Sequence, residues 1–151
     1  MTVSSKQIKA LRDLTSAGVI DCKNALEEAS GDMKKARLLL REKGKERALK
    51  KAGRETSQGL VHAYIHHGDK VGAMVKVLCE TDFVAKTVAF KDLVHHIAMQ
   101  AAALKPETKK ALLASCDIKD PSKKISDLVA EVVSQVGENI QVGDFVIYEI
   151  N

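Results

Sequence analysis

The sequence contains very few aromatic residues: no tryptophan, two tyrosines and three phenylalanines among 151 residues. It contains only three cysteines, Cys22, Cys79 and Cys116, at wide and irregular spacing. An odd number of cysteines at this spacing fits neither a disulfide framework nor a zinc module, so we expect reduced and mostly buried thiols. No apolar run approaches the roughly 20 residues of a membrane-spanning helix, and residues 1–11 lack the apolar segment of a signal peptide. These absences predict a cytoplasmic protein with no membrane partner.

The charge of the chain is nearly balanced. Lysine and arginine number 24 and aspartate and glutamate 20, which gives a net charge of +4, and 45% of the residues are hydrophobic. This composition fits one ordinary globular domain or two small ones, and it does not require a nucleic-acid partner. Residues 41–54 form a local exception, with seven basic and two acidic residues. Because no aromatic residue interrupts them, we interpret them as a solvated linker or helix tail rather than as an RNA-binding segment.

Three short helices are predicted at the start of the chain. Ser4 and Gln7 have the spacing of a capping box, and the helix that they begin should end at Gly18. Two more patterns with helical period follow, and the last begins after Asp32 as N-cap and should end before Gly44. Such a compact bundle leaves its outer surface free for a partner.

The pattern changes after residue 59 and predicts an α+β unit. Gly68 and Asp69 separate two segments of alternating polarity, which is typical of a β-hairpin. Asp120 and Pro121 suit the N-cap and first position of a helix that ends at Gly137. The predicted elements are a hairpin of residues 61–65 and 71–79, helices at 85–104, 107–115 and 121–137, and a third antiparallel strand at 142–150. A three-stranded sheet leaves exposed edges and a face through which two copies could pair.

The sequence shows no catalytic arrangement. Ser57, Ser115 and Cys79 have no base in a recognisable pattern, and no glycine-rich loop precedes a helix. Among the histidines, His62 and His66 share a strand face, but at ~3.3 Å per residue they lie about 13 Å apart, too far for one metal ion. We therefore expect no catalytic residue, no metal and no cofactor, and the chain is not expected to be an enzyme.

One aromatic residue, Phe83, stands where the second strand gives way to a helix. Thr81 and Asp82 just before it are good helix-capping residues. Two interpretations are open: Phe83 packs into the core as a hydrophobic staple, or it is exposed and contacts a partner. The segment alone favours the staple.

Two longer segments resemble the elongation factor Ts family. Residues 11–26 read LRDLTSAGVIDCKNAL and residues 79–86 read CETDFVAK, in the order in which the family has them. Residues 50–54 and 136–140 are similar to the family's linker and to the end of its last helix. The resemblance covers nearly the whole chain.

The resemblance implies both architecture and function. It implies a ubiquitin-associated-like three-helix domain (1–45), a basic linker (46–58) and a core α+β domain (59–151) with a three-stranded antiparallel sheet. It also implies guanine nucleotide exchange on elongation factor Tu, bound in its GDP and nucleotide-free forms. The residues implied to contact this partner are Lys9, Arg12, Val19, Ile20, Thr81, Asp82, Phe83 and Val84.

Each part of this set has an implied role. Phe83 would enter between helices of the partner near its magnesium and phosphate site, with Asp82 beside it, while Arg12, Val19 and Ile20 would dock the small domain. In this interpretation Phe83 is an exposed wedge rather than a staple.

The sequence departs from the family in several places. Leu78 stands where the family usually has Asn, and Val19 with Ile20 replaces a pair that is often Met. The family's short forms imply a homodimer through the core sheet, but the segment between Leu104 and Asp120 is shorter here, which would remove part of that interface. Two other functions stay open: an RNA-associated adaptor that uses residues 41–54, and a factor that holds elongation factor Tu without exchange.

Overall fold

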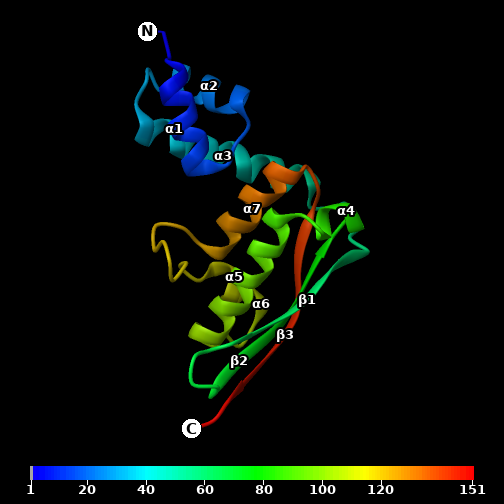
Figure 1. Ribbon diagram of the computed structural model, residues 1–151. Helices are drawn as coiled ribbons and strands as arrows, with labels where there is room; N and C mark the ends of the chain where they lie inside the picture. Colours follow the sequence, from blue (N-terminus) through cyan, green and yellow to red (C-terminus); the bar gives the residue numbers. More distant parts are fainter. Residues whose placement is uncertain (1) are drawn as a thin grey trace.

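The computed structural model describes residues 2–151, which fold into a helical bundle and a three-stranded sheet covered by helices on one face (Figure 1). The bundle lies at the N-terminal end of the molecule, and the C-terminus lies at the opposite end. None of the helices in residues 2–151 is long and apolar enough to span a membrane. The elements are α1 (Ser5–Thr15), α2 (Val19–Glu28), α3 (Met33–Lys51), β1 (Gln58–Ile65), β2 (Val71–Cys79), α4 (Asp82–Ala85), α5 (Val88–Leu104), α6 (Lys109–Ala114), α7 (Ile125–Val136) and β3 (Ile140–Glu149).

The predicted capping box begins α1. The Ser4 hydroxyl accepts the Gln7 backbone N–H at 3.3 Å, and the Gln7 side chain accepts the Ser4 backbone N–H at 3.0 Å. The helix ends at Ser16 in the left-handed region (φ 55°), and Gly18, the predicted stop, is instead the N-cap of α2. Asp32 caps α3 as predicted. The bundle has a small core of its own, formed by the buried residues Leu11, Cys22, Ala25, Leu26, Ala29 and Ala36.

The third helix does not end before Gly44, as predicted, but continues to Lys51. Gly44 is buried where α3 packs against α7, and a Cβ atom there would lie 3.9 Å from the Ala130 carbonyl oxygen. Gly44 is thus a packing position inside α3 and does not end the helix. Most of the basic segment is therefore helix, and α3 crosses the domain boundary predicted at residue 45, so the division into domains stays a prediction.

The sheet confirms the predicted hairpin and third strand. Its order is β1-β2-β3, with both pairs antiparallel. On the face toward α5, alternate residues of β2 such as Val75 and Val77 are at most 1% exposed, whereas Met74 on the other face is 45% exposed. The inner face, α5 and α7 share one hydrophobic core. The chain is thus α+β, as the sequence predicts.

The helix predicted at residues 85–104 begins at Val88 as α5, and the separate turn α4 ends at Ala85. Thr87 separates the two: its hydroxyl donates to the Val84 carbonyl at 2.7 Å and accepts the Phe90 N–H at 3.3 Å, so it caps α5. Phe83 therefore lies on a single helical turn between β2 and α5.

The prediction that the last helix begins at Asp120 and Pro121 is also wrong. The Asp120 side chain accepts the N–H and hydroxyl of Ser122 and forms a turn. The Ile125 N–H donates to the Ser115 carbonyl at 3.1 Å, which ties the segment before α7 to residues after α6. The helix α7 therefore begins only at Ile125, and Gly137 (φ 78°) ends it as predicted.

Candidate protein-binding site

The Phe83 side chain is 79% exposed, although it is large and apolar. It lies on α4 between Val84 and Asp82, and Val84 and Ala85 are both buried in the main core. The staple interpretation is therefore wrong for the chain on its own. Burial of the two following residues anchors the turn and leaves the ring directed away from the core.

Thr81 connects this turn to a residue that the sequence did not single out, Glu138. The Thr81 hydroxyl accepts the Val84 N–H at 3.4 Å and donates to the Glu138 carboxylate at 2.6 Å. The same carboxylate accepts the Thr81 backbone N–H at 3.0 Å. Glu138 lies in the loop between α7 and β3. The only sequence signal for it is that residues 136–140 are similar to the family.

Asp82 is the first residue of α4 and is exposed. Lys86, four residues later, donates to its carboxylate at 2.8 Å. This hydrogen bond is the main reason why the pKa of Asp82 is below its ordinary value. The residue before Phe83 thus carries an exposed carboxylate that is paired with Lys86.

The bundle presents a second exposed surface at the start of α2. Val19 is 51% and Ile20 73% exposed, and Lys9 and Arg12 are exposed on α1. The four residues therefore offer two apolar and two cationic side chains on neighbouring helices. This surface and the α4 turn are the two places where the residues predicted to bind a partner gather, except that Val84 is buried in the core.

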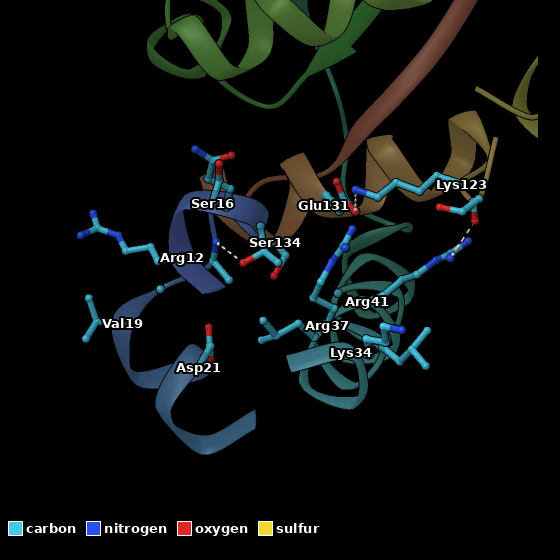
Figure 2. Close-up of a pocket in the computed structure, with 18 residues that line it drawn as sticks. Arg12, Ser16, Val19, Asp21, Lys34, Arg37, Arg41, Lys123, Glu131 and Ser134 are labelled. Atoms are coloured by element: carbon cyan, nitrogen blue, oxygen red, sulfur yellow. Dashed lines mark hydrogen bonds and ion pairs between the residues drawn. The ribbon is translucent and has the colours of Figure 1, made fainter. Parts of the chain in front are cut away.

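A cleft of about 710 Å³ lies between the α1–α2 turn, α3 and α7 (Figure 2). Arg12 and Val19 line it, whereas none of residues 81–84 does. Lys123 is paired with Glu131 on its wall at 2.7 Å. The cleft lies next to the bundle surface and is lined by cationic and acidic side chains from both parts of the chain.

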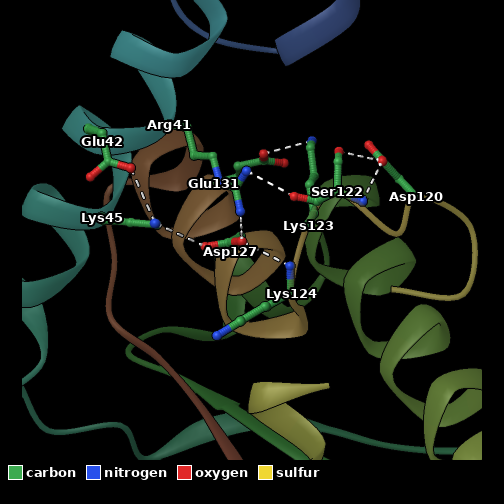
Figure 3. Close-up of polar contacts among 9 residues, drawn as sticks. All are labelled: Arg41, Glu42, Lys45, Asp120, Ser122, Lys123, Lys124, Asp127 and Glu131. Carbon is green, nitrogen blue, oxygen red and sulfur yellow. Dashed lines mark hydrogen bonds and ion pairs between the residues drawn. The ribbon is translucent and has the colours of Figure 1, made fainter. Parts of the chain in front are cut away.

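The basic segment on α3 is used largely in contacts with the rest of the chain. Arg41 forms an ion pair with Asp127 of α7, and Lys45 lies 3.5 Å from the same carboxylate (Figure 3). Arg47 donates to both carboxylate oxygens of Asp21 at 2.8 and 2.7 Å. Cations that are paired within the fold are less available to phosphates, so these contacts favour the structural interpretation of residues 41–54.

Asp127 is buried, with its side chain 5% exposed. Burial by itself raises the pKa of this carboxyl group, but the Lys124 N–H and the cationic Arg41 and Lys45 outweigh it, so that its pKa is below the ordinary value. The carboxylate therefore stays charged between the two helices and joins α3 to the core.

The histidines and cysteines make local contacts. His62 and His95 ring nitrogens lie 3.0 Å apart, and His96 lies 2.6 Å from a buried Asp117 oxygen. Within residues 2–151, no three side chains of the metal-ligating types lie close enough together to hold a metal ion. Cys22 and Cys79 are buried, which raises the pKa of both thiols, whereas Cys116 is exposed.

Among the described residues, no helix covers the outer face of the sheet (Figure 1), which is apolar around Met74 and carries the Lys76–Asp144 ion pair beside that area. Met74 of β2 pairs with Ala63 on one side and Val146 on the other. Exposed apolar side chains extend this face along β1 and β3. They are Val61, Ile65, Val146 and Tyr148.

Comparison with known proteins shows what the chain is related to. Residues 80–151 match a family model described as "Elongation factor TS". The chain is 41% identical to the elongation factor Ts of Coprothermobacter proteolyticus, an alignment that covers 97% of each protein. It is 39% identical to that of Moorella thermoacetica, over 98% of this chain and 95% of the relative. Its identity to the elongation factor Ts of Thermotoga maritima is 38%, over 99% of this chain and 97% of the relative.

These alignments extend over 191 to 193 residues, whereas this chain has 151. Because the alignment includes 97% of this chain, about 45 residues of the relatives have no counterpart here. The similarity nevertheless covers nearly all of this chain at about 40% identity. The chain belongs to the elongation factor Ts family.

Proposed function

We propose that the chain is a guanine nucleotide exchange factor for elongation factor Tu in translation, and that Phe83 is the wedge that promotes GDP release. The observation that carries this proposal is the 79% exposed ring on a turn whose following residues are buried. An exposed aromatic side chain on an anchored turn loses little conformational freedom on binding, and such residues often dominate an interface. The ring enters between helices of the partner near its magnesium and phosphate site.

Asp82 acts together with Phe83 in this proposal. Its carboxylate, on the residue before Phe83, is ionised and exposed. A negative charge brought near the bound magnesium and phosphates competes with the phosphates for the same cationic groups. Magnesium and phosphate contacts are then weakened, and GDP leaves faster.

Exchange by this route follows from thermodynamic linkage. If bound GDP lowers the affinity of elongation factor Tu for the chain, the chain must lower the affinity for GDP by the same factor. Each tenfold change corresponds to ~1.4 kcal/mol, so a few lost phosphate and magnesium contacts supply several powers of ten. The chain makes and breaks no covalent bond in this process, so it is not an enzyme in the usual sense.

The bundle provides the second contact with the GTPase domain. Val19 and Ile20 on α2 supply exposed apolar area, and Lys9 and Arg12 on α1 supply exposed charge. Two sites on one chain raise the effective concentration of the second contact once the first has formed. The bundle thus gives affinity, while the α4 turn acts on the nucleotide.

A second copy of the chain is the proposed occupant of the outer sheet face. Met74, Val61 and Tyr148 expose apolar area there, and the pairing of β1, β2 and β3 makes this area continuous. The resemblance to the family's short forms implies pairing through this sheet, and such a homodimer would bind two molecules of elongation factor Tu. We place this activity in the cytoplasm, where translation takes place.

Release of fluorescent GDP from elongation factor Tu tests the exchange function. The chain is added in substoichiometric amounts, with excess unlabelled GDP, and the release rate is followed. Faster release, with one chain serving many molecules of elongation factor Tu, supports an exchange factor. Binding without faster release would support a factor that only holds its partner.

A further inference from the structure

Two turns of the core hold each other through their acidic side chains. The Glu138 carboxylate, between α7 and β3, accepts the backbone N–H groups of Glu80 at 3.2 Å and Thr81 at 3.0 Å. In return, the Glu80 carboxylate accepts the backbone N–H of Asn139 at 2.7 Å. Each turn thus satisfies backbone donors of the other, so that the turn after β2 has a fixed position relative to the start of β3.

Glu138 also determines how Thr81 caps α4. A hydroxyl has a single proton, and that of Thr81 is donated to Glu138 at 2.6 Å. The hydroxyl oxygen therefore faces the Val84 N–H, at 3.4 Å, with a lone pair. Without the carboxylate, the Thr81 proton would have no fixed direction, and the cap of α4 would compete with other hydroxyl orientations.

The α4 turn depends on such support because it is short. It has four residues, too few for a helix that is stable by itself. The Phe83 ring is 79% exposed and has little packing of its own, so its direction follows from the backbone of the turn. Val84 and Ala85 hold the C-terminal side of the turn in the core, and Glu138 holds the N-terminal side.

We propose that Glu138 is a positioning residue for exchange: it fixes the direction of Phe83 through Thr81 and the β2–α4 backbone. This inference rests on the proposed function, because it assigns Glu138 a role in the action of the wedge. A ring that is already directed toward its partner loses less freedom on binding than one on a mobile turn.

The same junction holds the end of α3. The Asn139 amide donates to the carbonyl oxygens of Ala52 at 3.3 Å and Arg54 at 2.8 Å. Asn139 is 3% exposed, whereas Ala52 and Arg54 are exposed, so these bonds tie a buried side chain to the surface segment after α3. The helix that carries the bundle and the turn that carries Phe83 are therefore fixed to one short segment, residues 138–139.

A double-mutant cycle with Phe83 tests this role. Glu138→Ala should lower kcat/KM for GDP release from elongation factor Tu about tenfold in the wild-type background, but less than about twofold in the Phe83→Ala background. Equal losses in both backgrounds would overturn the proposal, because Glu138 would then act independently of the ring. Glu149→Ala is the matched control: it removes a carboxylate at the far end of β3 that is paired with Lys105 after α5, and it should leave the rate unchanged.

Amide hydrogen exchange in the free chain gives a readout that does not depend on elongation factor Tu. Glu138→Ala should speed exchange of the Thr81 and Val84 amides by at least about tenfold, with amides of α5 unchanged. Unchanged protection at both amides would overturn the proposal. If wild type itself fails to speed GDP release, the proposed function fails, and these amides still decide whether Glu138 holds the turn.

If Glu138→Ala does not fold, Glu138→Gln provides a second test of the proposal. The amide keeps one acceptor oxygen but directs an NH₂ group toward backbone donors. A smaller loss of exchange rate, again dependent on Phe83, is expected. A loss of the same size in the Phe83→Ala background would contradict the proposal.

Discussion

Arg41 of α3 and Asp127 of α7 form an ion pair although they are 86 residues apart in the chain. Arg41 also donates to the Ser122 carbonyl at 3.0 Å, and Asp127 accepts the Lys124 N–H at 2.8 Å. Figure 3 shows that these contacts join the long helix of the bundle to the segment that begins α7. The pair thus connects the bundle to the core, the two parts of the chain that are proposed to bind elongation factor Tu.

Asp127→Asn should destabilise the chain by roughly 2 kcal/mol, because it weakens charge-assisted hydrogen bonds of a buried carboxylate. The expected fall in melting temperature is roughly 5 °C. Glu42→Gln serves as the control, since Glu42 is an exposed partner of Lys45. A melting temperature equal to that of wild type would show that the pair does not stabilise the fold.

The Asp127 carboxylate should also make the stability of the chain depend on pH. The pKa of Asp127 is lower in the folded chain than in the unfolded one, so its contribution is fully present above the unfolded value of about 3.9 and is lost as pH falls through the folded pKa. In urea unfolding, the stability difference between wild type and Asp127→Asn should be largest near neutral pH and should shrink below about pH 4. A difference that stays constant down to pH 2 would contradict this.

Ile20→Asp should weaken binding of the chain to nucleotide-free elongation factor Tu by at least about tenfold, because a charge replaces an exposed apolar contact at the centre of the bundle surface. Calorimetric titration measures the affinity. Leu49→Asp is the matched control, since Leu49 is also exposed but lies near the end of α3. Equal losses for the two variants would show that Ile20 has no special place in the interface.

Met74→Glu should convert a dimer of the chain into a monomer. It places a charge at the centre of the outer sheet face, between Ala63 and Val146, while the inner face and the core stay as they are. Sedimentation velocity of wild type and variant gives the masses. Wild type that sediments as a monomer at high concentration would exclude pairing through this face.

Salt dependence separates protein binding from the RNA alternative. Binding to RNA through six or more phosphate contacts would lose about 10³-fold or more in affinity between 50 and 200 mM salt. Since Arg41, Arg47 and Lys45 are paired within the chain, the exchange rate should change less than about threefold over this range. A steep loss would restore the RNA interpretation of residues 41–54.

The sequence predicts the local structure well where short-range signals act alone. The Ser4–Gln7 capping box, the Gly68–Asp69 turn and the Gly137 helix end all form as predicted. The predictions fail where tertiary contacts decide: Gly44 is a contact with α7 rather than a helix end, and α7 begins at Ile125, which pairs with Ser115, rather than at Pro121.

The candidate site, too, could be predicted only where short-range signals act alone. The place of Phe83 between a strand and a helix singled it out but favoured a buried staple, and only the resemblance to a family implied an exposed wedge, since the local pattern cannot tell which way a single ring points. Glu138 was not predicted because it contacts Thr81 from 57 residues away. No spacing or period in the sequence encodes that contact.

Release of fluorescent GDP from elongation factor Tu, measured with wild type and with Phe83→Ala at equal concentration, tests the proposed wedge most directly. We expect wild type to accelerate release and the variant, with an unchanged thermal melt, to lose at least about tenfold in kcat/KM, a loss of ~1.4 kcal/mol or more. A variant that accelerates release as well as wild type would contradict the role of Phe83.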